Sequence, residues 1–353
     1  MSGEDVRPEP QKVISGTTRA AVFVVLTVEP GGEGAVREAL GDLAGLVRSL
    51  GFRKPGEDLS CVTGIGSTAW DRLFAGPRPA ELHPFRELRG ARHTAPATLG
   101  DVLLHIRAQR LDLCFELAAI VTRRLAGAAR VVDETHGFTY FDQRDLLGFV
   151  DGTENPLGRA AAEAALIGEE DPEFAGGSYV VVQKYLHDLD AWDGLTVEEQ
   201  QHVVGRTKLE DIELPDGVQR PDSHVAVNQV LDADGEERQI LRANMPFGSV
   251  ADGRFGTYFI GYCRTPEVTE QMLRNMFLGT DGAPHDRILD FSTAVTGSLF
   301  AVPPAGFLDE LPPAPGTGNA VRRTAADVPL DSSLRIGSLK PVPKPVPTST
   351  KAE

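Results

Sequence analysis

The sequence predicts an α+β fold made of two similar halves, each with an antiparallel sheet and packed helices. Its strand-like and helix-like segments lack the regular alternation that a doubly wound parallel sheet requires. An order of strand, helix and further strands occurs in the first half of the chain and is repeated in the second. The length of 353 residues is sufficient for one large domain or two ordinary ones.

The first half is expected at residues 20–145, after a disordered N-terminal segment at 1–19. It opens with AAVFVVLTV at 20–28, whose apolar and β-branched residues are typical of a central strand covered on both faces. Apolar residues then recur at spacings of three and four, which indicates a helix. The elements predicted after the first strand are a helix at 36–50, a strand at 59–65, a long helix from residue 98 and alternating segments at 129–141.

The long helix is predicted from a start signal and an apolar stripe. Thr98 and Asp101 resemble a capping box, in which two side chains satisfy the first free N–H groups of a helix. Apolar residues then follow at helical spacing over residues 99–121, with an interruption around Arg110.

The second half is expected at 146–305 and consists of the same kinds of segment. Its short helix at 196–206 begins with a capping box, Thr196 with Glu199, and has a glycine near its end. Thr265-Pro266 opens another helix, because proline is favoured at the first helical position. The strands of this half are predicted at 178–185, 239–245 and 257–263.

The last part of the chain, 306–353, is predicted to be a flexible, proline-rich tail. Prolines, glycines and polar residues dominate it, so it has too little apolar surface to bury. A small apolar island, Leu334 to Leu339, lies within this tail. The island has either no role or that of a short docking peptide, since both would have the same sequence.

Charge and composition exclude several classes of protein. The formal net charge of −16 argues against nucleic acid or an anionic membrane as the main partner, because both require a basic face. No apolar run reaches the roughly 18 residues that span a bilayer, and the polar N-terminus lacks a signal peptide. Cys61, Cys114 and Cys263 lie far apart and indicate reduced thiols in a cytoplasmic protein.

The loop at 148–156, GFVDGTENP, is the first candidate for chemistry. Gly152 permits a turn with positive φ and Asn155-Pro156 requires an extended exit, so Asp151 is held in a defined orientation. One interpretation is a turn with a solvated aspartate. The other is a carboxylate at the edge of a dry pocket, where its pKa would be raised and it could transfer a proton.

The segment at 239–247, QILRANMPF, is the second candidate. Strand alternation places Ile240, Arg242 and Asn244 on one face. Both faces carry apolar residues, and burying a guanidinium beside an amide is unfavourable unless each has a partner. The pair is therefore either a structural ion-pair site or a cationic donor and an amide that face a small polar ligand or a developing negative charge.

One of the eight histidines, His224, lies where a turn leads into an apolar segment, a suitable position for an imidazole that faces a pocket. No histidine or carboxylate pattern with zinc spacing accompanies it. A single axial ligand of haem iron fits this position better than a zinc site does.

These motifs resemble those of the dye-decolourising peroxidases, close to the B-type bacterial members, over residues 20–305. The most specific match is the GxxDG loop that contains Asp151. Several further motifs follow in the same order along the chain, namely 204–208 (VGRTK), 222–224 (DSH), 242–247 (RANMPF) and 257–262 (TYFIGY).

The resemblance implies two ferredoxin-like halves and one b-type haem (heme b) per chain, held mainly by the C-terminal half. His224 matches the proximal iron ligand, and Arg206 matches the residue that pairs with a haem propionate. The proximal histidine of the family donates its second N–H to a carboxylate, which raises its basicity as a ligand. Asp286 is the first choice for that carboxylate and Asp290 the second.

The resemblance also implies the activity of a haem peroxidase that reduces hydrogen peroxide and oxidises organic donors such as dyes or phenolics. Asp151, Arg242 and Asn244 match the catalytic residues of the distal side. A homo-oligomer, from dimer to hexamer, is expected. A surface Trp or Tyr could relay electrons to the haem. The candidates are Trp70, Trp192, Tyr185 and Tyr262, and ordinary packing is the alternative role of each.

The tail carries a second resemblance. Residues 331–340, DSSLRIGSLK, are similar to the peptides that load peroxidases of this type into encapsulin shells. An encapsulin shell protein is therefore an expected partner, and the expected location is inside an encapsulin nanocompartment in the cytoplasm.

Two other functions are compatible with parts of the sequence. A protein that handles haem or its iron without peroxidase turnover would use the same His224, but it has no need of a set formed by Asp151, Arg242 and Asn244. A haem-free interaction module that is anchored by its tail would need none of these four residues.

Overall fold

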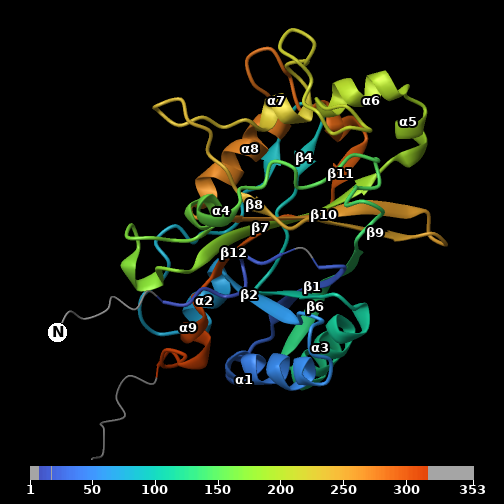
Figure 1. The fold of residues 1–353 in the computed structure, drawn as a ribbon. Coiled ribbons are helices and arrows are strands. Elements are labelled where there is room, and N and C mark those ends of the chain that lie inside the picture. The colour runs from blue at the N-terminus through green and yellow to red at the C-terminus, as the bar shows by residue number, and fades with distance from the viewer. Residues whose placement is uncertain (1–7, 17, 317–353) are drawn as a thin grey trace, which may run out of the picture. The chain divides into compact units, whose positions relative to one another are not determined.

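The computed structural model describes residues 8–16 and 18–316, and its main feature is a ten-stranded antiparallel sheet (Figure 1). Eight strands form a continuous path in the order β6-β1-β5-β2-β12-β7-β10-β8, while β11 pairs with β7 and β9 pairs with β10. Helices and antiparallel strands therefore occur in both halves, which confirms the predicted α+β class.

The N-terminal half contains four strands of this sheet and the helices that cover them. Strand β1 is buried along nearly its whole length because it pairs with β5 on one side and β6 on the other. Helices α1 and α3 pack against each other below the sheet in the view of Figure 1. The elements are β1 (Ala20–Val28), α1 (Glu33–Phe52), β2 (Ser60–Gly66), α2 (Ser67–Leu73), the hairpin of β3 (Leu88–Arg89) and β4 (Thr94–Ala95), β5 (Val102–Ala108), α3 (Leu111–Arg124) and β6 (Ala129–Phe138).

The C-terminal half contributes the other six strands, and its helix boundaries follow the predicted caps. Thr196 and Glu199 form the capping box of α6, and Gly205 ends this helix at φ 97°. Thr265 caps α8, whose first residue is Pro266. The elements are α4 (Gly158–Ala165), η1 (Pro172–Phe174), β7 (Ser178–His187), α5 (Leu189–Asp193), α6 (Val197–Val204), α7 (His224–Asn228), β8 (Leu241–Arg242), β9 (Met245–Ser249), β10 (Arg254–Cys263), α8 (Pro266–Leu278), η2 (Arg287–Asp290), β11 (Ser292–Ala294), β12 (Ser298–Val302) and α9 (Ala305–Asp309).

Strand β12 joins the two halves into one sheet. It pairs with β7 over residues 298–302 and with β2 through Phe300↔Gly66 and Ala301↔Ile65. The sequence predicted two sheets packed together, but it gave no signal for this edge-to-edge pairing. A strand that is buried on both faces has an apolar run in its sequence, and this run does not indicate which strand lies beside it.

The prediction of one long helix from Thr98 is wrong. The segment forms strand β5, a turn, and then helix α3, with Arg110 as the residue before the helix. All seven residues of β5 are buried, and the strand pairs with β1 on one side and β2 on the other. Its apolar residues therefore cover both faces of a central strand and do not form one face of a helix. Asp101 does not cap a helix, because its carboxylate accepts the N–H of Val28 at 2.8 Å.

The predicted boundaries of the disordered ends are also wrong in part. Gln11 is buried, and its side-chain amide donates to the carbonyls of Thr63 and Pro303 at 3.1 and 2.8 Å. At the other end, residues 305–309 form a helix, and Arg37 donates to the carbonyl of Pro312 at 2.6 Å. Both segments pack on the domain because these hydrogen bonds to residues distant in sequence secure them. The expected docking peptide at 331–340 lies outside the described residues.

The strand predicted at 239–245 is interrupted. It consists of the two-residue strand β8 and the separate strand β9, both paired with β10. Between them the Asn244 side chain accepts the N–H of Ile260 at 3.1 Å, a position that a neighbouring strand carbonyl would otherwise take. The interruption thus directs a polar side chain into the sheet at this point.

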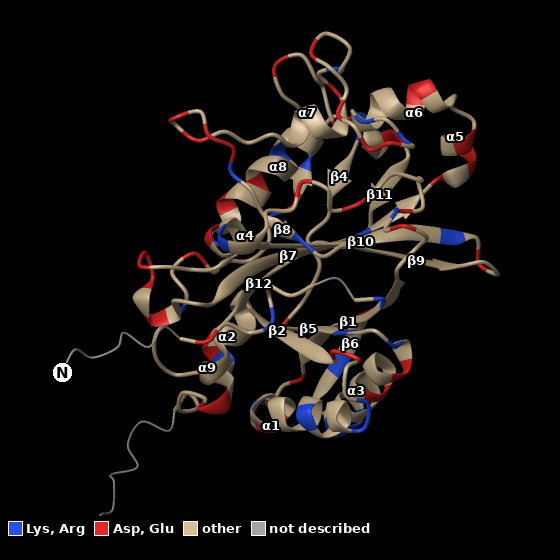
Figure 2. Ribbon diagram, viewed as in Figure 1, with Lys and Arg blue, Asp and Glu red and all other residues tan. Residues whose placement is uncertain are grey.

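The described surface matches the acidic composition. Figure 2 shows acidic residues on α5, α6 and α9, with basic residues scattered among other elements. Within residues 8–16 and 18–316, no helix is both long and apolar enough to cross a bilayer.

Candidate functional site

The predicted site residues meet at one cavity in the C-terminal half. It measures about 1150 Å³ with its mouth included, and Asp151, Arg206, His224, Arg242 and Asn244 all line it. Much of the remaining wall is apolar, formed by side chains such as Leu147, Phe149, Ile240, Phe259, Met272 and Leu273. An apolar cavity with a few converging polar groups is the usual form of a cofactor or substrate site.

The loop at 148–156 is fixed to strand β8 by Asn155. The side-chain amide of Asn155 donates to the carbonyl of Arg242 and its oxygen accepts the N–H of Arg242, both at 2.8 Å. Gly148 and Gly152 have φ values of 92° and 84°, in the left-handed region that glycine tolerates. The loop and the strand are therefore one rigid unit, which places Asp151 and Arg242 beside the same cavity.

Asn244 positions Asp151. Because its oxygen accepts the N–H of Ile260, the amide nitrogen must point the other way, and it donates to Oδ1 of Asp151 at 3.2 Å. No hydrogen bond from a described residue reaches Oδ2 of Asp151, so this oxygen is available at the cavity. The carboxylate is thus oriented by an amide whose own rotation is fixed.

Arg242 has the position that strand alternation predicts. Ile240, Arg242 and Asn244 line the cavity, whereas Leu241 and Ala243 pack against the core on the opposite face. The Nε atom of Arg242 is buried and has no hydrogen-bond partner in the described part of the chain. A buried cationic donor without a partner is unfavourable in isolation, which indicates that the cavity normally holds an acceptor for it.

His224 is the first residue of the short helix α7, and its ring is held by a buried carboxylate. The Nδ1 atom lies 2.6 Å from Oδ2 of Asp286, whose side chain is 0% exposed. Since a carboxylate only accepts, Nδ1 carries a proton, and in the neutral ring the lone pair is therefore on Nε2. Asp290, the second choice for this contact, instead contacts His93 and His285, each at 3.1 Å.

Asp286 is itself tightly held. Its Oδ1 accepts the N–H of Ile288 at 3.0 Å, and its Oδ2 also accepts from the Asn228 amide at 3.3 Å. Burial alone would lower the pKa of His224, but the charge and the hydrogen bond of Asp286 outweigh it, so the net pKa of His224 is raised. An imidazole of raised basicity with a free Nε2 is a strong ligand for a metal ion.

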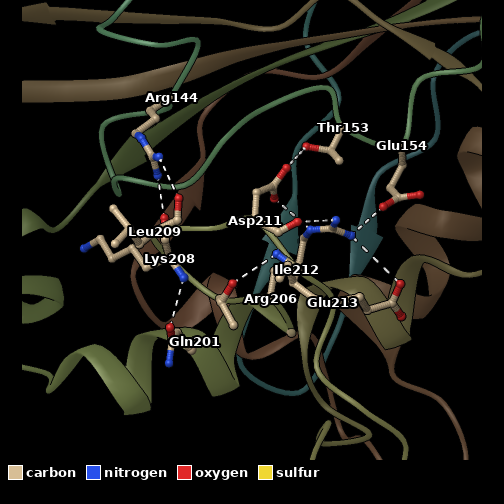
Figure 3. A network of polar contacts seen from close by, with 12 residues as sticks. Arg144, Thr153, Glu154, Gln201, Arg206, Lys208, Leu209, Asp211, Ile212 and Glu213 are labelled. Carbon is tan, nitrogen blue, oxygen red and sulfur yellow. Dashed lines mark hydrogen bonds and ion pairs between the residues drawn. The ribbon is translucent and has the colours of Figure 1, made fainter.

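Arg206 lines the cavity but is engaged by protein carboxylates (Figure 3). Its Nε donates to Oδ1 of Asp211 at 2.8 Å, its Nη2 donates to the Asp211 carbonyl at 2.7 Å, and its Nη1 donates to Glu154. Glu213 lies 3.9 Å from the same Nη1. An anionic ligand would therefore have to share Nη1 with two glutamates.

Several residues that hold the site were missed by sequence reasoning. Asn228, which bonds both His224 and Asp286, lies four residues after His224, and this helical spacing could have indicated it. His187 is held in the cavity wall by Ser292 and Thr257, and burial lowers its pKa to about 4. No local pattern marks His187, because its partners come from β10 and β11.

The four aromatic candidates for electron relay differ in their relation to the cavity. Trp70, Trp192 and Tyr262 are 0–1% exposed and belong to the packed core. Tyr185 lines the cavity and donates to Oε1 of Gln183 at 2.8 Å. The structure therefore places none of these four side chains as an open surface group.

Asp145 is a further carboxyl group of the cavity wall that the sequence did not single out. Its Oδ1 accepts the N–H of Phe149 at 3.0 Å. Desolvation, with the nearby charge of Asp151, raises the pKa of Asp145 to about 7. At pH 6 the folded protein therefore keeps a proton on Asp145 that the unfolded chain has released.

We expect the Asp145→Asn variant to lose part of the pH dependence of stability. A carboxyl whose folded pKa is raised destabilises the folded state as pH rises from about 4 to about 7. Without haem, the free energy of unfolding of the variant, relative to that of the wild type, should rise by roughly 2–4 kcal/mol between pH 4 and pH 7.5. Urea unfolding at both pH values measures this, with Asp234→Asn in an exposed loop as the control. Equal pH dependence in the variant and the wild type would contradict the assignment.

The cavity fits a haem group by the chemistry of its donors. It offers one imidazole Nε2 as an axial ligand, apolar walls, and a buried guanidinium Nε without a partner. The side-chain nitrogen of Gln183, also in the wall, is buried without a partner among the described residues. These groups can hold a flat, mostly apolar cofactor that carries a metal and anionic substituents.

Comparison with known proteins gives consistent matches along the described domain. The family model of the Dyp-type peroxidase N-terminal domain matches residues 10–139, and that of the C-terminal domain matches residues 142–307. A dye-decolorizing peroxidase of Mycolicibacterium paratuberculosis is 60% identical over 332 residues, 94% of this chain and 93% of the relative.

Solved structures agree with these matches. The encapsulated DyP-type peroxidase of Mycobacterium smegmatis has a TM-score of 0.86 and 60% identity, and the match covers 87% of this chain and 100% of that one. A variant of Rhodococcus jostii RHA1 DypB in complex with haem has a TM-score of 0.84 and 52% identity, covering 86% of this chain and 99% of that one.

Proposed function

Since the chain belongs to the Dyp-type peroxidase family, we propose that its cavity is a haem peroxidase site in which His224 is the proximal ligand. The chain is a dye-decolourising peroxidase, and the proposal states which residues bind the cofactor and which act on peroxide. One observation carries it, namely that His224, backed by Asp286, and the linked pair Asp151–Asn244 line the same cavity.

The residues of the proximal side would hold the cofactor, one b-type haem per chain. His224 binds the iron through Nε2, and Asp286 keeps the ring oriented and basic. Arg206 is proposed to pair with a propionate through Nη1, which requires Glu154 to move aside. When bound, the haem would supply a redox-active iron centre, through which a reductant can give single electrons to a reaction that consumes peroxide.

The residues of the distal side would act on hydrogen peroxide. Asp151 takes the proton from one peroxide oxygen and delivers it to the other, directly or through water, by way of the free Oδ2. Arg242 stabilises the negative charge that builds on the leaving oxygen. Asn244 keeps the carboxylate of Asp151 turned toward the cavity and acts as a positioning residue.

An absorption spectrum of the purified protein, before and after one equivalent of hydrogen peroxide, tests this proposal. We expect a Soret band that changes on mixing and returns when an organic donor such as an anthraquinone dye is added. A pyridine haemochrome assay should give one b-type haem per chain. Absence of a Soret band after haem addition would overturn the proposal.

The tail is proposed to load the enzyme into an encapsulin shell. Two observations support this, the similarity of residues 331–340 to loading peptides and the likeness of the fold to an encapsulated relative. Leu334, Ile336 and Leu339 would occupy apolar pockets on the shell wall, and the proline-rich linker would give reach. The oxidised donors would then be small molecules that can enter the shell.

Deletion from Asp331 onward should abolish packaging and leave the peroxidase activity intact. The activity is expected to persist because the site lies within the described domain, far along the chain from the tail. Co-expression with a shell protein, followed by size-exclusion chromatography and haem absorbance of the shell fraction, measures packaging. Unchanged packaging of the truncated enzyme would remove the tail from this role.

A further inference from the structure

A second group of metal-ligand side chains lies outside the cavity. His93, His285 and Asp290 each offer a ligand atom, and these atoms lie within 4.8 Å of one another. His93 belongs to the β3–β4 hairpin of the N-terminal half, whereas in the C-terminal half His285 lies two residues before η2 and Asp290 is the last residue of η2. Segments almost 200 residues apart in sequence thus bring together two imidazoles and a carboxylate.

Two of the three ligand–ligand distances in this cluster are close to those around a tetrahedral metal ion, and the third is no longer than 4.8 Å. The Nε2 atoms of His93 and His285 each lie 3.1 Å from the same oxygen, Oδ1 of Asp290. With metal–ligand bonds of about 2.0–2.1 Å, neighbouring ligands of a tetrahedral ion are roughly 3.3 Å apart. A small relaxation would therefore admit an ion at the centre of the three atoms. We propose that this cluster is a binding site for a divalent transition metal ion of the Zn²⁺ type, with water as the fourth ligand.

The cluster is accessible to an ion and is held by its surroundings. The side chains of His93, His285 and Asp290 are 21%, 10% and 25% exposed. Gly90 donates to the His93 carbonyl at 2.9 Å, and a Cβ on Gly90 would lie 1.9 Å from the Phe277 carbonyl, so the hairpin rests directly on α8. The ligands are thus brought together before the ion binds, which reduces the entropy lost on binding.

The two imidazoles and one carboxylate determine which class of metal ion the cluster prefers. Two nitrogen donors and one oxygen donor favour borderline transition metals over Ca²⁺ or Mg²⁺, which prefer oxygen donors only. One group opposes binding, since Nη1 of Arg92 lies 3.7 Å from Oδ1 of Asp290. Removing this cation should therefore increase the affinity for the metal ion.

A bound ion would act on the architecture of the protein and not on its reaction. It would link the β3–β4 hairpin to the segment that carries Asp286, the partner of His224. Binding to the folded state alone lowers the equilibrium constant for unfolding, about 100-fold when the free ion is at 100 times its dissociation constant. This inference does not depend on the proposed peroxidase mechanism.

Equilibrium dialysis of the full-length, haem-loaded protein against micromolar Zn²⁺, with metal measured by mass spectrometry, tests the site. We expect one strongly bound Zn²⁺ per chain, an affinity at least tenfold lower for His93→Ala and Asp290→Asn, and a higher affinity for Arg92→Ala. The control is His136→Ala, which removes an exposed histidine that contacts a single carboxylate, Glu134, and should leave the affinity unchanged.

The fold of each variant is checked separately by its Soret band and its melting temperature without zinc. His93→Gln is a second variant, since its amide can still bond Asp290 but is a poor zinc ligand. The proposal is overturned if the wild type binds no Zn²⁺ at these concentrations. It is equally overturned if His93→Ala and His93→Gln, both correctly folded, bind Zn²⁺ as tightly as the wild type does.

Discussion

Replacement of Arg242 by leucine is expected to lower the rate constant for the reaction with hydrogen peroxide by about 10²–10³-fold. The guanidinium lines the cavity, and its buried Nε has no partner within the described residues, so it can donate to a developing negative charge without first breaking a protein hydrogen bond. Its backbone is fixed by two hydrogen bonds to Asn155, both at 2.8 Å. A donor that is already oriented in a dry site requires no reorganisation when the charge appears.

Stopped-flow mixing of the haem-loaded variant with peroxide measures this rate constant. Leucine retains the apolar stem of arginine, so haem content and the Soret maximum should remain close to those of the wild type. Arg159→Leu is the matched control, because Arg159 is an exposed residue of α4 that pairs with Glu163. A near-normal rate for Arg242→Leu would remove this residue from the mechanism and leave Asp151 as the main distal group.

The parts of the fold that sequence could predict are those fixed by local signals. The strand at 20–28 and the caps of α6 agree with the structure because each depends on residues within one element. The helix predicted from Thr98 is wrong because the apolar run of this segment fits both a helix face and a strand that is covered on both sides. Only the pairing with β1 and β2, which are distant in sequence, decides between them.

The same division applies to the site. Strand alternation was sufficient to place Arg242 and Asn244 on one face. It could not show that Asn155 fixes Arg242, nor that Asp211 and two glutamates surround Arg206, because these contacts form only when loops from different parts of the chain close on one another. The family resemblance supplied roles for the residues, and the structure supplies the partners that orient them.

The position of the His224 side chain is fixed by neighbouring segments more than by its own helix. Helix α7 has only five residues, so it has little stability of its own. The Asn228 amide bonds the His224 carbonyl at 2.7 Å, and the Asn275 amide bonds the carbonyl of Val227 at 3.0 Å. The position of the imidazole is therefore set by α8 and by the Asp286 segment, which explains how a short turn-like segment can hold this side chain rigidly.

Replacement of His224 by alanine should have two separable consequences. The protein would lose its axial nitrogen ligand, so any haem that still enters the cavity should show altered axial coordination in its absorption and electron paramagnetic resonance spectra. The haem-free protein should also lose about 1–3 kcal/mol of stability, because the fully buried Asp286 would keep only the Ile288 N–H and the Asn228 amide as partners.

The double variant His224→Ala with Asp286→Asn separates these effects. Asparagine removes the uncompensated buried charge, so the free energy of unfolding of the haem-free protein, measured in urea, should recover toward the wild-type value. The axial coordination should not recover, because no imidazole has been restored. If the single variant binds haem with an unchanged coordination spectrum, His224 is not the iron ligand. If the double variant is no more stable than the single one, Asp286 is not an ionised partner of His224. The proximal pair must then be assigned to other residues.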